Sequence, residues 1–596
     1  MHDQRIAEYQ KKYEHHHQLF QQAHLLHHRL GMARLAAMLV ALVLCYYAYN
    51  KQQTAMWVAA GACVVAFVLL VQKQRKVDAE RRLQQELSNV NEEEAAYLRD
   101  GKLSCADGAA YRDDTHAFSA DLDIFGTRSL YQHVNRTATQ MGRDALARSF
   151  TTLNDQDTIA ARQAAVAELA GEAEQRHLFY AHARLVNDEK QDSARLLAWS
   201  GRAEEPLSAV LRILSFLMPS LLGVSIVLYA VTGGEQWWSA ITYVVPLQLA
   251  VFFFSFKRIK KAIAGTEQVQ KTLVAYAQLL RLMEQRSFTA PHLAAMQQRL
   301  KQDETPASTH IMQLAAIYAS LENVQNPFAA MGMNGLYLHH LHALHRLVQW
   351  KKQYATFIPA WLQAIGDMEA LNSLANLRYN NPAFCFPVLN NRQHISFTAM
   401  GHPTIPATHR VCNDVSFTES RFIILTGSNM SGKSTFLRTM GVNMVLCNAG
   451  SAVCAQEAGI HPMPMFVSMR QSDSLADNES YFFAEVKRLQ HIIGHLNSGP
   501  AFVLLDEILR GTNSDDKRSG TIGVIEKIIR TQAIGAIATH DLEVCHTTDA
   551  YPTVLTNKCF EVETAGGELS FDYRLRSGIC QNKNATFIMK KMGIID

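Results

Sequence analysis

Apolar residues gather in four long runs in the first half of the chain. One pair of runs covers residues 35–49 and 54–71, and a second pair covers residues 213–231 and 237–256. Each run has about 15 to 20 residues, which at ~1.5 Å of rise per residue approaches or matches the ~30 Å hydrocarbon core of a bilayer. Short polar turns join the runs within each pair. The pattern predicts two transmembrane helical hairpins.

The residues that flank these runs are typical of a membrane boundary. Trp237 and Trp238 begin the fourth run, at a level where indole rings are favoured. Basic residues flank both hairpins: Arg29, Arg34, Lys73, Arg75, Lys76, Arg202, Arg212, Lys257, Arg258, Lys260 and Lys261. By the positive-inside rule, all the long segments outside the hairpins are then cytoplasmic. Buried helices of a large soluble protein are the alternative, which the paired arrangement disfavours.

The start of the chain does not resemble a cleavable signal peptide. The first apolar run begins only after about thirty polar residues, and a second run follows it at once. We therefore expect a multi-pass protein of a bacterial-type cytoplasmic (inner) membrane.

The remaining pattern separates helical parts from an α/β part. Helical periodicity dominates residues 128–200 and 258–375, and strands alternate with helices after residues 380–387. We expect the following parts in chain order: an N-terminal cytoplasmic helix (1–31), a transmembrane hairpin (32–73), a cytoplasmic linker helix (74–120), a helical segment (121–205), a second hairpin (206–258), a second helical segment (259–380) and an α/β domain (381–596).

A glycine-rich loop carries the clearest chemical signal. Gly427 is followed at the required spacing by Gly432, Lys433 and Ser434, between an apolar run and a helix-compatible run. In such a loop the backbone N–H groups converge on phosphate oxygens, the lysine reaches the β and γ phosphates, and the Ser hydroxyl binds Mg²⁺. The helix that follows adds the positive end of its dipole. This context predicts a phosphate-binding loop rather than a chance glycine turn.

Two later strands end in polar residues that suit nucleotide hydrolysis. The apolar run 502–505 ends at Asp506 and Glu507, and the run 533–538 is followed by His540. The carboxyl ends of strands are where an open α/β sheet places its ligand chemistry. We expect Asp506 to hold Mg²⁺, Glu507 to polarise the attacking water and His540 to lie near the γ phosphate.

At these motifs the chain resembles the ATPase of the MutS mismatch-repair family. The resemblance rests on the loop 426–435 with its Asn429-Met430 pair, on the run Asp-Glu-Ile-Leu-Arg-Gly-Thr at 506–512, and on Ala-Thr-His-Asp at 538–541. It extends to Gly401-His402-Pro403 upstream of Asn413-Asp414, and to the segment 472–485. Segments 122–142 and 366–371 are similar to the start and end of the family's helical lever domain.

The resemblance implies an α/β P-loop NTPase of the ABC-type ATPase class, preceded by an all-α lever domain and here combined with two transmembrane hairpins. It implies a homodimer with ATP and Mg²⁺ at the subunit interface. ATP-binding residues would be Gly427, Ser428, Asn429, Met430, Ser431, Gly432, Lys433, Ser434, Thr435, Val411 and Tyr573. Catalytic residues would be Glu507, Lys433, His540 and a partner-supplied Ser480, and Mg²⁺ would be held by Ser434 and Asp506.

The N-terminal region departs from the family's mismatch readers. Such proteins carry a Phe-x-Glu element in a globular domain ahead of the lever, and residues 1–120 contain no Phe-x-Glu. The first hairpin stands in place of that domain, and the second hairpin interrupts the lever where a DNA-gripping clamp would be expected.

Composition adds few constraints. The formal net charge of +3 gives no independent support for a DNA-binding surface. The ten cysteines include no Cys-x-x-Cys pair, so neither a zinc knuckle nor a disulfide framework is indicated. The histidines at 15–17, 24, 27 and 28 have a spacing that could ligate a metal, although a solvated helix beside the membrane is the simpler interpretation.

Two functions from different classes remain open. In the first, ATP binding and hydrolysis open and close a dimeric helical clamp on mismatched or branched DNA. In the second, the chain is a membrane-embedded ATP switch that acts on a membrane protein partner without DNA. A conventional ABC transporter is disfavoured because no Leu-Ser-Gly-Gly-Gln signature is present, and intact Lys433, Asp506 and Glu507 disfavour a non-enzymatic scaffold.

Overall fold

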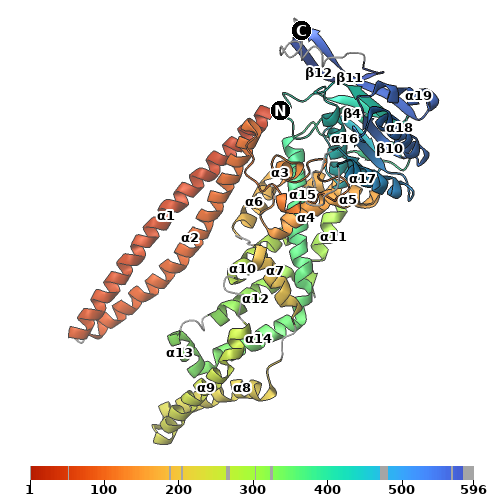
Figure 1. Ribbon diagram of the computed structural model, residues 1–596. Coiled ribbons are helices and arrows are strands. Elements are labelled where there is room, and N and C mark those ends of the chain that lie inside the picture. Colours follow the sequence, from red (N-terminus) through yellow and green to blue (C-terminus); the bar gives the residue numbers. More distant parts are fainter. Residues whose placement is uncertain are drawn as a thin grey trace.

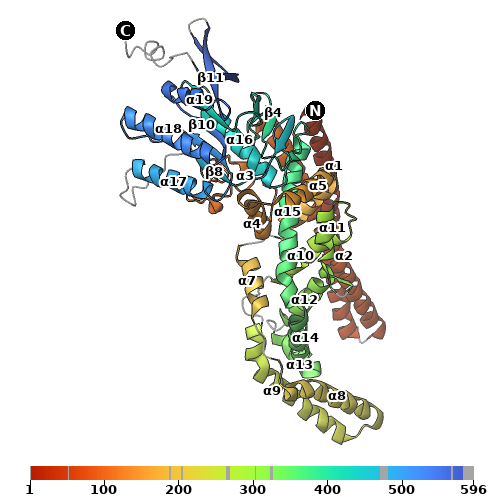
Figure 2. The same cartoon turned by 90° about the vertical axis from the view of Figure 1, so that its right-hand side faces the viewer.

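The computed structural model describes residues 2–51, 53–186, 190–202, 206–262, 269–302, 304–322, 327–469, 481–565 and 568–580. An α/β domain forms one end of the molecule, and a long helical lever extends from it to a helical hairpin at the far end (Figure 1). A second, longer hairpin built from the N-terminal residues leaves the lever near the α/β domain and forms a separate leg (Figures 1 and 2).

The N-terminal leg consists of two helices, α1 (His2–Lys51) and α2 (Thr54–Asp100). Each helix runs without a break through polar residues and an apolar run, although the sequence predicted a separate N-terminal helix over 1–31 and a separate linker helix over 74–120. No proline interrupts either helix, so nothing in the backbone ends it at the apolar boundary. Large apolar side chains in the first half of α2, such as Val58 and Leu69, are exposed.

The second hairpin is formed by α8 (Ala209–Thr232) and α9 (Glu235–Ala262) at the far end of the lever. Pro219 and Pro246 lie inside these helices. In the part of the chain that the structure describes, α1, α2, α8 and α9 are long and apolar enough to cross a membrane.

The lever is all helical except for one short β-hairpin, β1 (Lys301–Gln302) with β2 (Thr305–Pro306). Its helices are α3 (Leu130–Val134), α4 (Gln140–Thr151), α5 (Gln156–Ala170), α6 (Ala173–Arg184), α7 (Lys190–Gly201), α10 (Val269–Glu284), α11 (Pro291–Gln298), α12 (Ala307–Glu322), α13 (Pro327–Tyr337), α14 (His339–Tyr354) and α15 (Ile358–Asn380), with 3₁₀ turns η1 (Ala109–Tyr111) and η3 (Ala355–Phe357). Helix α15 is buried along most of its length and leads directly into the α/β domain (Figure 2).

The α/β domain contains two mixed sheets. The larger has the strand order β12-β11-β6-β10-β9-β8, in which β11, β6, β10, β9 and β8 are parallel and β12 is an antiparallel edge. Its strands are β6 (Phe422–Gly427), β8 (Met465–Ser468), β9 (Phe502–Asp506), β10 (Ile534–Ala538), β11 (Leu555–Ala565) and β12 (Glu568–Ser577). The smaller sheet has the order β3-β7-β4-β5, with β3 (Val388–Leu389), β4 (Ser396–Met400), β5 (Asn413–Ser416) and β7 (Glu457–Ile460).

Helices cover both faces of the larger sheet. They are α16 (Lys433–Asn448), α17 (Tyr481–Leu496), α18 (Ser514–Arg530) and α19 (Thr547–Ala550), with the 3₁₀ turn η4 (Leu542–His546). Alternate residues of β6 enter different cores: Ile423 packs with residues of α16, whereas Ile424 packs with residues of α17 and α18. This explains why β6, β9 and β10 are buried at every position and do not alternate between apolar and polar residues.

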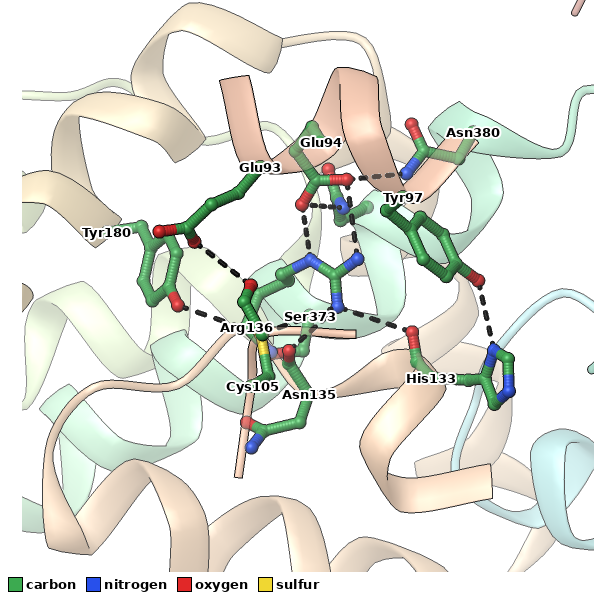
Figure 3. Close-up of polar contacts among 12 residues, drawn as sticks. Glu93, Glu94, Tyr97, Cys105, His133, Asn135, Arg136, Tyr180, Ser373 and Asn380 are labelled. Atoms are coloured by element: carbon green, nitrogen blue, oxygen red, sulfur yellow. Dashed lines mark hydrogen bonds and ion pairs between the residues drawn. The ribbon is translucent and has the colours of Figure 1, made fainter. Parts of the chain in front are cut away.

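A buried ionic cluster fastens the N-terminal leg to the lever (Figure 3). Glu94 of α2 pairs with Arg136, which lies between α3 and α4, and its carboxylate also accepts hydrogen bonds from Asn376 and Asn380 of α15, each at 3.0 Å. Burial alone would raise the pKa of Glu94, but the Arg136 guanidinium outweighs it and holds the pKa below its usual value. The leg is therefore joined to the same helix that reaches the α/β domain.

Close packing joins the lever to helix α16 of the α/β domain. A Cβ atom at Gly441 would lie 2.6 Å from the Leu122 side chain, so a larger residue there would displace Leu122. Nearby, Asp121 accepts a 2.8 Å hydrogen bond from the Met469 backbone and pairs with Arg488 at 2.8 Å. A movement of α16 would therefore displace the lever residues that pack against it.

Candidate functional site

The candidate site lies where three neighbouring parallel strands end. The carboxyl ends of β6, β10 and β9 carry Gly427, His540 and Asp506 respectively. The sequence predicted a strand before each of these residues, and the structure contains all three. Parallel strands bring their carboxyl ends to one edge of a sheet, which is the usual ligand position in such folds.

The glycine loop between β6 and α16 needs its glycines. Gly432 has a φ of 104°, and Gly427 has a φ of 153° with the Phe560 carbonyl oxygen only 2.9 Å from where a Cβ would lie. Met430 also adopts a left-handed conformation, with φ 66°. Helix α16 begins at Lys433, so its first backbone N–H groups face the loop with no acceptor within the helix. Such an arrangement attracts anions.

Lys433 is buried beneath this loop. Its Nζ donates to the carbonyl oxygens of Gly427, at 2.9 Å, and Ser428, at 3.0 Å. Burial lowers the pKa of the ammonium, and the carboxylates of Glu507 and Asp506 offset part of that effect. The lysine ammonium is thus held beside the loop by carbonyl oxygens, and phosphate oxygens could accept the same hydrogen bonds.

Ser434 and Asp506 form an oxygen-rich pair that fits a magnesium ion. The Ser434 hydroxyl donates to Asp506 Oδ2 at 2.5 Å, and Asp506 is buried at the end of β9. Its other oxygen, Oδ1, is buried without a hydrogen-bond partner among the described residues. A hydroxyl and a carboxylate with an unused oxygen are the ligands that Mg²⁺ prefers.

Glu507 is held by two basic side chains. His540 Nε2 lies 2.5 Å from Glu507 Oε1, and the Arg510 guanidinium lies 3.1 Å from Oε2. The hydrogen bond with His540, reinforced by the charges of His540, Arg510 and Lys433, lowers the pKa of Glu507 to about 2. A carboxylate with so low a pKa is a weak base, so the geometry favours orienting a water molecule over removing its proton.

A cavity of about 400 Å³ opens beside the loop. Residues of the loop and α16 form one wall, and Val411 and Tyr573 line it as well. Asn413 holds Tyr573 in place: its side chain donates to the Tyr573 carbonyl at 3.0 Å and accepts from the Leu575 backbone at 2.8 Å. The structure therefore brings Val411 and Tyr573 to the loop from distant parts of the chain, and their role in clasping adenine stays a prediction.

Most of the predicted site residues converge here. Asn429, Met430, Ser431, Gly432, Lys433, Ser434, Thr435 and Glu507 line the cavity, while Asp506 and His540 contact it through Ser434 and Glu507. Gly427 and Ser428 bind the Lys433 ammonium. Ser480 lies outside the described residues.

Three further residues belong to this site although sequence reasoning gave them no role. Glu485 accepts hydrogen bonds from the backbone of Leu509, at 2.8 Å, and Arg510, at 3.0 Å, and so shapes the turn after Glu507. His402 lines the cavity, and burial lowers its pKa to about 4. Glu485, His402 and Arg510 all lie in the motifs that carried the resemblance. The motifs contain these residues but do not indicate which groups they contact.

Comparison with known proteins identifies the fold of this site. Residues 423–594 match the family model described as MutS domain V. Over these residues the α/β domain is therefore similar to MutS. MutS-family proteins are in general ATPases.

Several relatives align with the same region. Human "MutS protein homolog 4" is 32% identical over 188 residues, which are 30% of this chain and 20% of that protein. The "DNA mismatch repair protein MutS" of Thermotoga maritima is 30% identical over 242 residues, or 39% of this chain and 30% of the relative. The protein of that name from a Synechococcus strain is 33% identical over 231 residues, or 38% and 25%. The chain thus spans about a fifth to a third of the length of these relatives.

Proposed function

We propose that this MutS-like chain is a Mg²⁺-dependent ATPase anchored in a membrane. The observation that carries the proposal is the convergence of Lys433, the Ser434–Asp506 pair and the Glu507–His540 pair at one edge of a cavity of about 400 Å³. This volume is in the range of small-molecule sites. Phosphoryl transfer requires a phosphate-binding loop, a cation, metal ligands and a carboxylate that orients water.

Each residue has a defined task in the proposed reaction. Lys433 and the loop N–H groups bind the β and γ phosphates, and Ser434 and Asp506 hold the metal, which when bound supplies positive charge against the phosphates. Glu507 orients the attacking water, whose oxygen bonds to the γ phosphorus as the bond to the ADP oxygen breaks. His540 positions Glu507 and senses the γ phosphate. A partner subunit's copy of the segment around Ser480 completes the site in a homodimer, as the family resemblance implies.

Two apolar hairpins are the basis for the membrane anchor. In α8 and α9 the polar side chains of Ser225 and Gln248 are fully buried, while Val227 and Phe254 are exposed. Water would favour the reverse, whereas hydrocarbon favours apolar side chains outside and polar ones inside. With the α1–α2 tip and the α8–α9 hairpin in a cytoplasmic membrane, the lever and the ATPase domain would lie in the cytoplasm.

The partner of the lever has two candidates. The names of the relatives favour DNA, so that ATP-driven opening and closing of a dimeric clamp would act on mismatched or branched duplexes. The far end of the lever favours a membrane partner instead, because it is the apolar hairpin α8–α9 (Figure 2).

Turnover measurements separate the candidates. ATP hydrolysis by the detergent-solubilised full chain would be measured alone and with homoduplex, mismatched and branched DNA, at low and high salt. Turnover that rises with DNA at low salt and loses the rise at high salt supports the clamp. Turnover that is indifferent to all three DNAs at every salt concentration supports the membrane switch. No turnover under any condition contradicts the ATPase itself.

A further inference from the structure

Helix α13 (Pro327–Tyr337) presents an apolar surface to its surroundings. It contains no charged residue, and the side chains of Phe328 and Leu336 are 89% and 62% exposed. Met331 and Tyr337 are exposed as well. A helix on a water-facing surface directs its polar residues outward, so this pattern needs a different environment.

The polar residue of α13 points the other way. Asn334 is fully buried, and its side-chain nitrogen donates to the Ala330 carbonyl at 2.7 Å and lies 2.6 Å from His340 Nδ1. Its side-chain oxygen accepts from the His340 backbone at 3.1 Å. The side chain of Asn334 is therefore hydrogen-bonded inside the protein while apolar side chains of α13 are exposed. Helices α8 and α9 likewise bury polar side chains and expose apolar ones.

The position of α13 identifies what covers this surface. Gly335 packs against the middle of α9, where a Cβ atom would lie 3.5 Å from Val245 and 3.7 Å from Leu249. Both views place α13 beside the α8–α9 hairpin (Figures 1 and 2). The exposed apolar surface of α13 is thus continuous with that of a helix long and apolar enough to cross a membrane.

We propose that α13 is a lipid-contacting helix that enters the cytoplasmic leaflet beside α9 without crossing the bilayer. Its 11 residues span only about 16 Å at ~1.5 Å per residue, which is half of the ~30 Å hydrocarbon core. The chain turns back at Leu338, which has a φ of 47°, and continues into α14. This inference depends on the proposed membrane anchor.

The contact gives the lever its own connection to the bilayer. Helix α14 is joined to α12 by a 3.0 Å hydrogen bond from the Trp350 indole to the His310 carbonyl, and it leads through η3 into α15. A nucleotide-driven movement of α15 would therefore reach α13 through packed helices as well as through the hairpin.

Photocrosslinking to lipid tests the inference. The full chain would carry a benzophenone amino acid at Phe328 or at Leu336 and be reconstituted in nanodiscs of phosphatidylethanolamine and phosphatidylglycerol with alkyne-tagged acyl chains. Val227 of α8 serves as the membrane reference, and Met312 of α12, an exposed apolar residue elsewhere on the lever, serves as the matched control. ATP turnover of each variant checks that it has folded.

Labelling at Phe328 and Leu336 should match that at Val227 and exceed that at Met312 by about tenfold or more, since only lipid-exposed positions meet acyl chains. If Val227 is labelled but Phe328 and Leu336 are labelled no more than Met312, the inference is overturned and the membrane anchor still stands. Crosslinks from Phe328 or Leu336 to a second copy of the chain or to another protein would overturn it too. Absence of label at Val227 would instead refute the membrane anchor on which it depends.

Discussion

His540 Nε2 lies 2.5 Å from Glu507 Oε1 and 3.4 Å from Lys433 Nζ. One imidazole therefore contacts both the carboxylate that would orient water and the ammonium that would bind the γ phosphate. Because the three residues come from different strands and from the glycine loop, nucleotide binding at Lys433 would be transmitted directly to the geometry of Glu507.

Glu507→Gln should retain ATP but stop turnover. Glutamine keeps the size of the side chain and one carbonyl oxygen but loses the carboxylate charge that polarises water. We expect kcat to fall by about 10² to 10³, the range for the loss of one preorganised electrostatic contact to the reacting atoms, with nucleotide affinity kept. Rapid-quench turnover and equilibrium binding on the same preparation measure both quantities. Equal turnover in wild type and the variant would reject the role given to Glu507.

Lys433→Ala should abolish nucleotide binding. The ammonium is buried, and its two shortest hydrogen bonds go to loop carbonyl oxygens, which phosphate oxygens can replace as acceptors. Isothermal titration with ATP and Mg²⁺ measures the affinity. Lys527→Ala, an exposed basic residue of α18, is the control and should bind as the wild type does. Wild-type affinity in Lys433→Ala would exclude the loop as the phosphate site.

The pH dependence of turnover should depend on His540. The pKa of Glu507 is about 2 in the folded chain and 4.5 ordinarily, so its stabilising interactions are fully present above pH 4.5 and are lost as the pH falls through 2. His540→Ala removes the main cause of this shift, and the pKa should return toward 4.5. Profiles of kcat from pH 4.5 to 8 should then show an acidic limb that begins at higher pH in His540→Ala than in wild type. The exposed His546→Ala should leave the limb unchanged, and coincident limbs in all three proteins would contradict the assigned cause.

Glu94→Ala should destabilise the junction between the N-terminal leg and the lever. The variant leaves the buried Arg136 guanidinium without its carboxylate, and breaking a buried pair in this way costs about 3–5 kcal/mol. Glu93→Ala is the matched control, because its side chain is 32% exposed in its pair with Arg184 and should contribute about 0–1 kcal/mol. Denaturant unfolding of the solubilised chain measures the loss of unfolding free energy in each variant. Equal losses would show that burial of the Glu94 pair adds nothing.

The parts of the fold that could be predicted are those written in short stretches of sequence. The glycine loop at Gly427 to Ser434 is local, because the required backbone conformations and the following helix lie within a few residues. The apolar runs likewise predict two hairpins from their length and composition alone. Parallel strands ending at Asp506 and His540 then had to meet at one edge of the sheet.

Other features depend on contacts between distant residues, which no short pattern contains. Asn413 fixes Tyr573, and Glu94 pairs with Arg136 across 42 positions of sequence. Helix α13 is too short to be noticed as a membrane element by hydropathy, since only its inverted burial and its place beside Val245 distinguish it from an ordinary lever helix. Val411 and Tyr573 could be named only through the family resemblance.

Co-flotation tests the central claim most directly. The full chain would be reconstituted into phosphatidylethanolamine–phosphatidylglycerol vesicles, mixed with Mg²⁺ and a fluorescent ATP analogue, and separated on a density gradient. We predict that the wild-type chain rises with the vesicles and carries the nucleotide with it, and that Lys433→Ala rises without nucleotide. A wild-type chain that stays in the dense fractions, or one that floats but carries no nucleotide, would contradict a membrane-anchored ATPase.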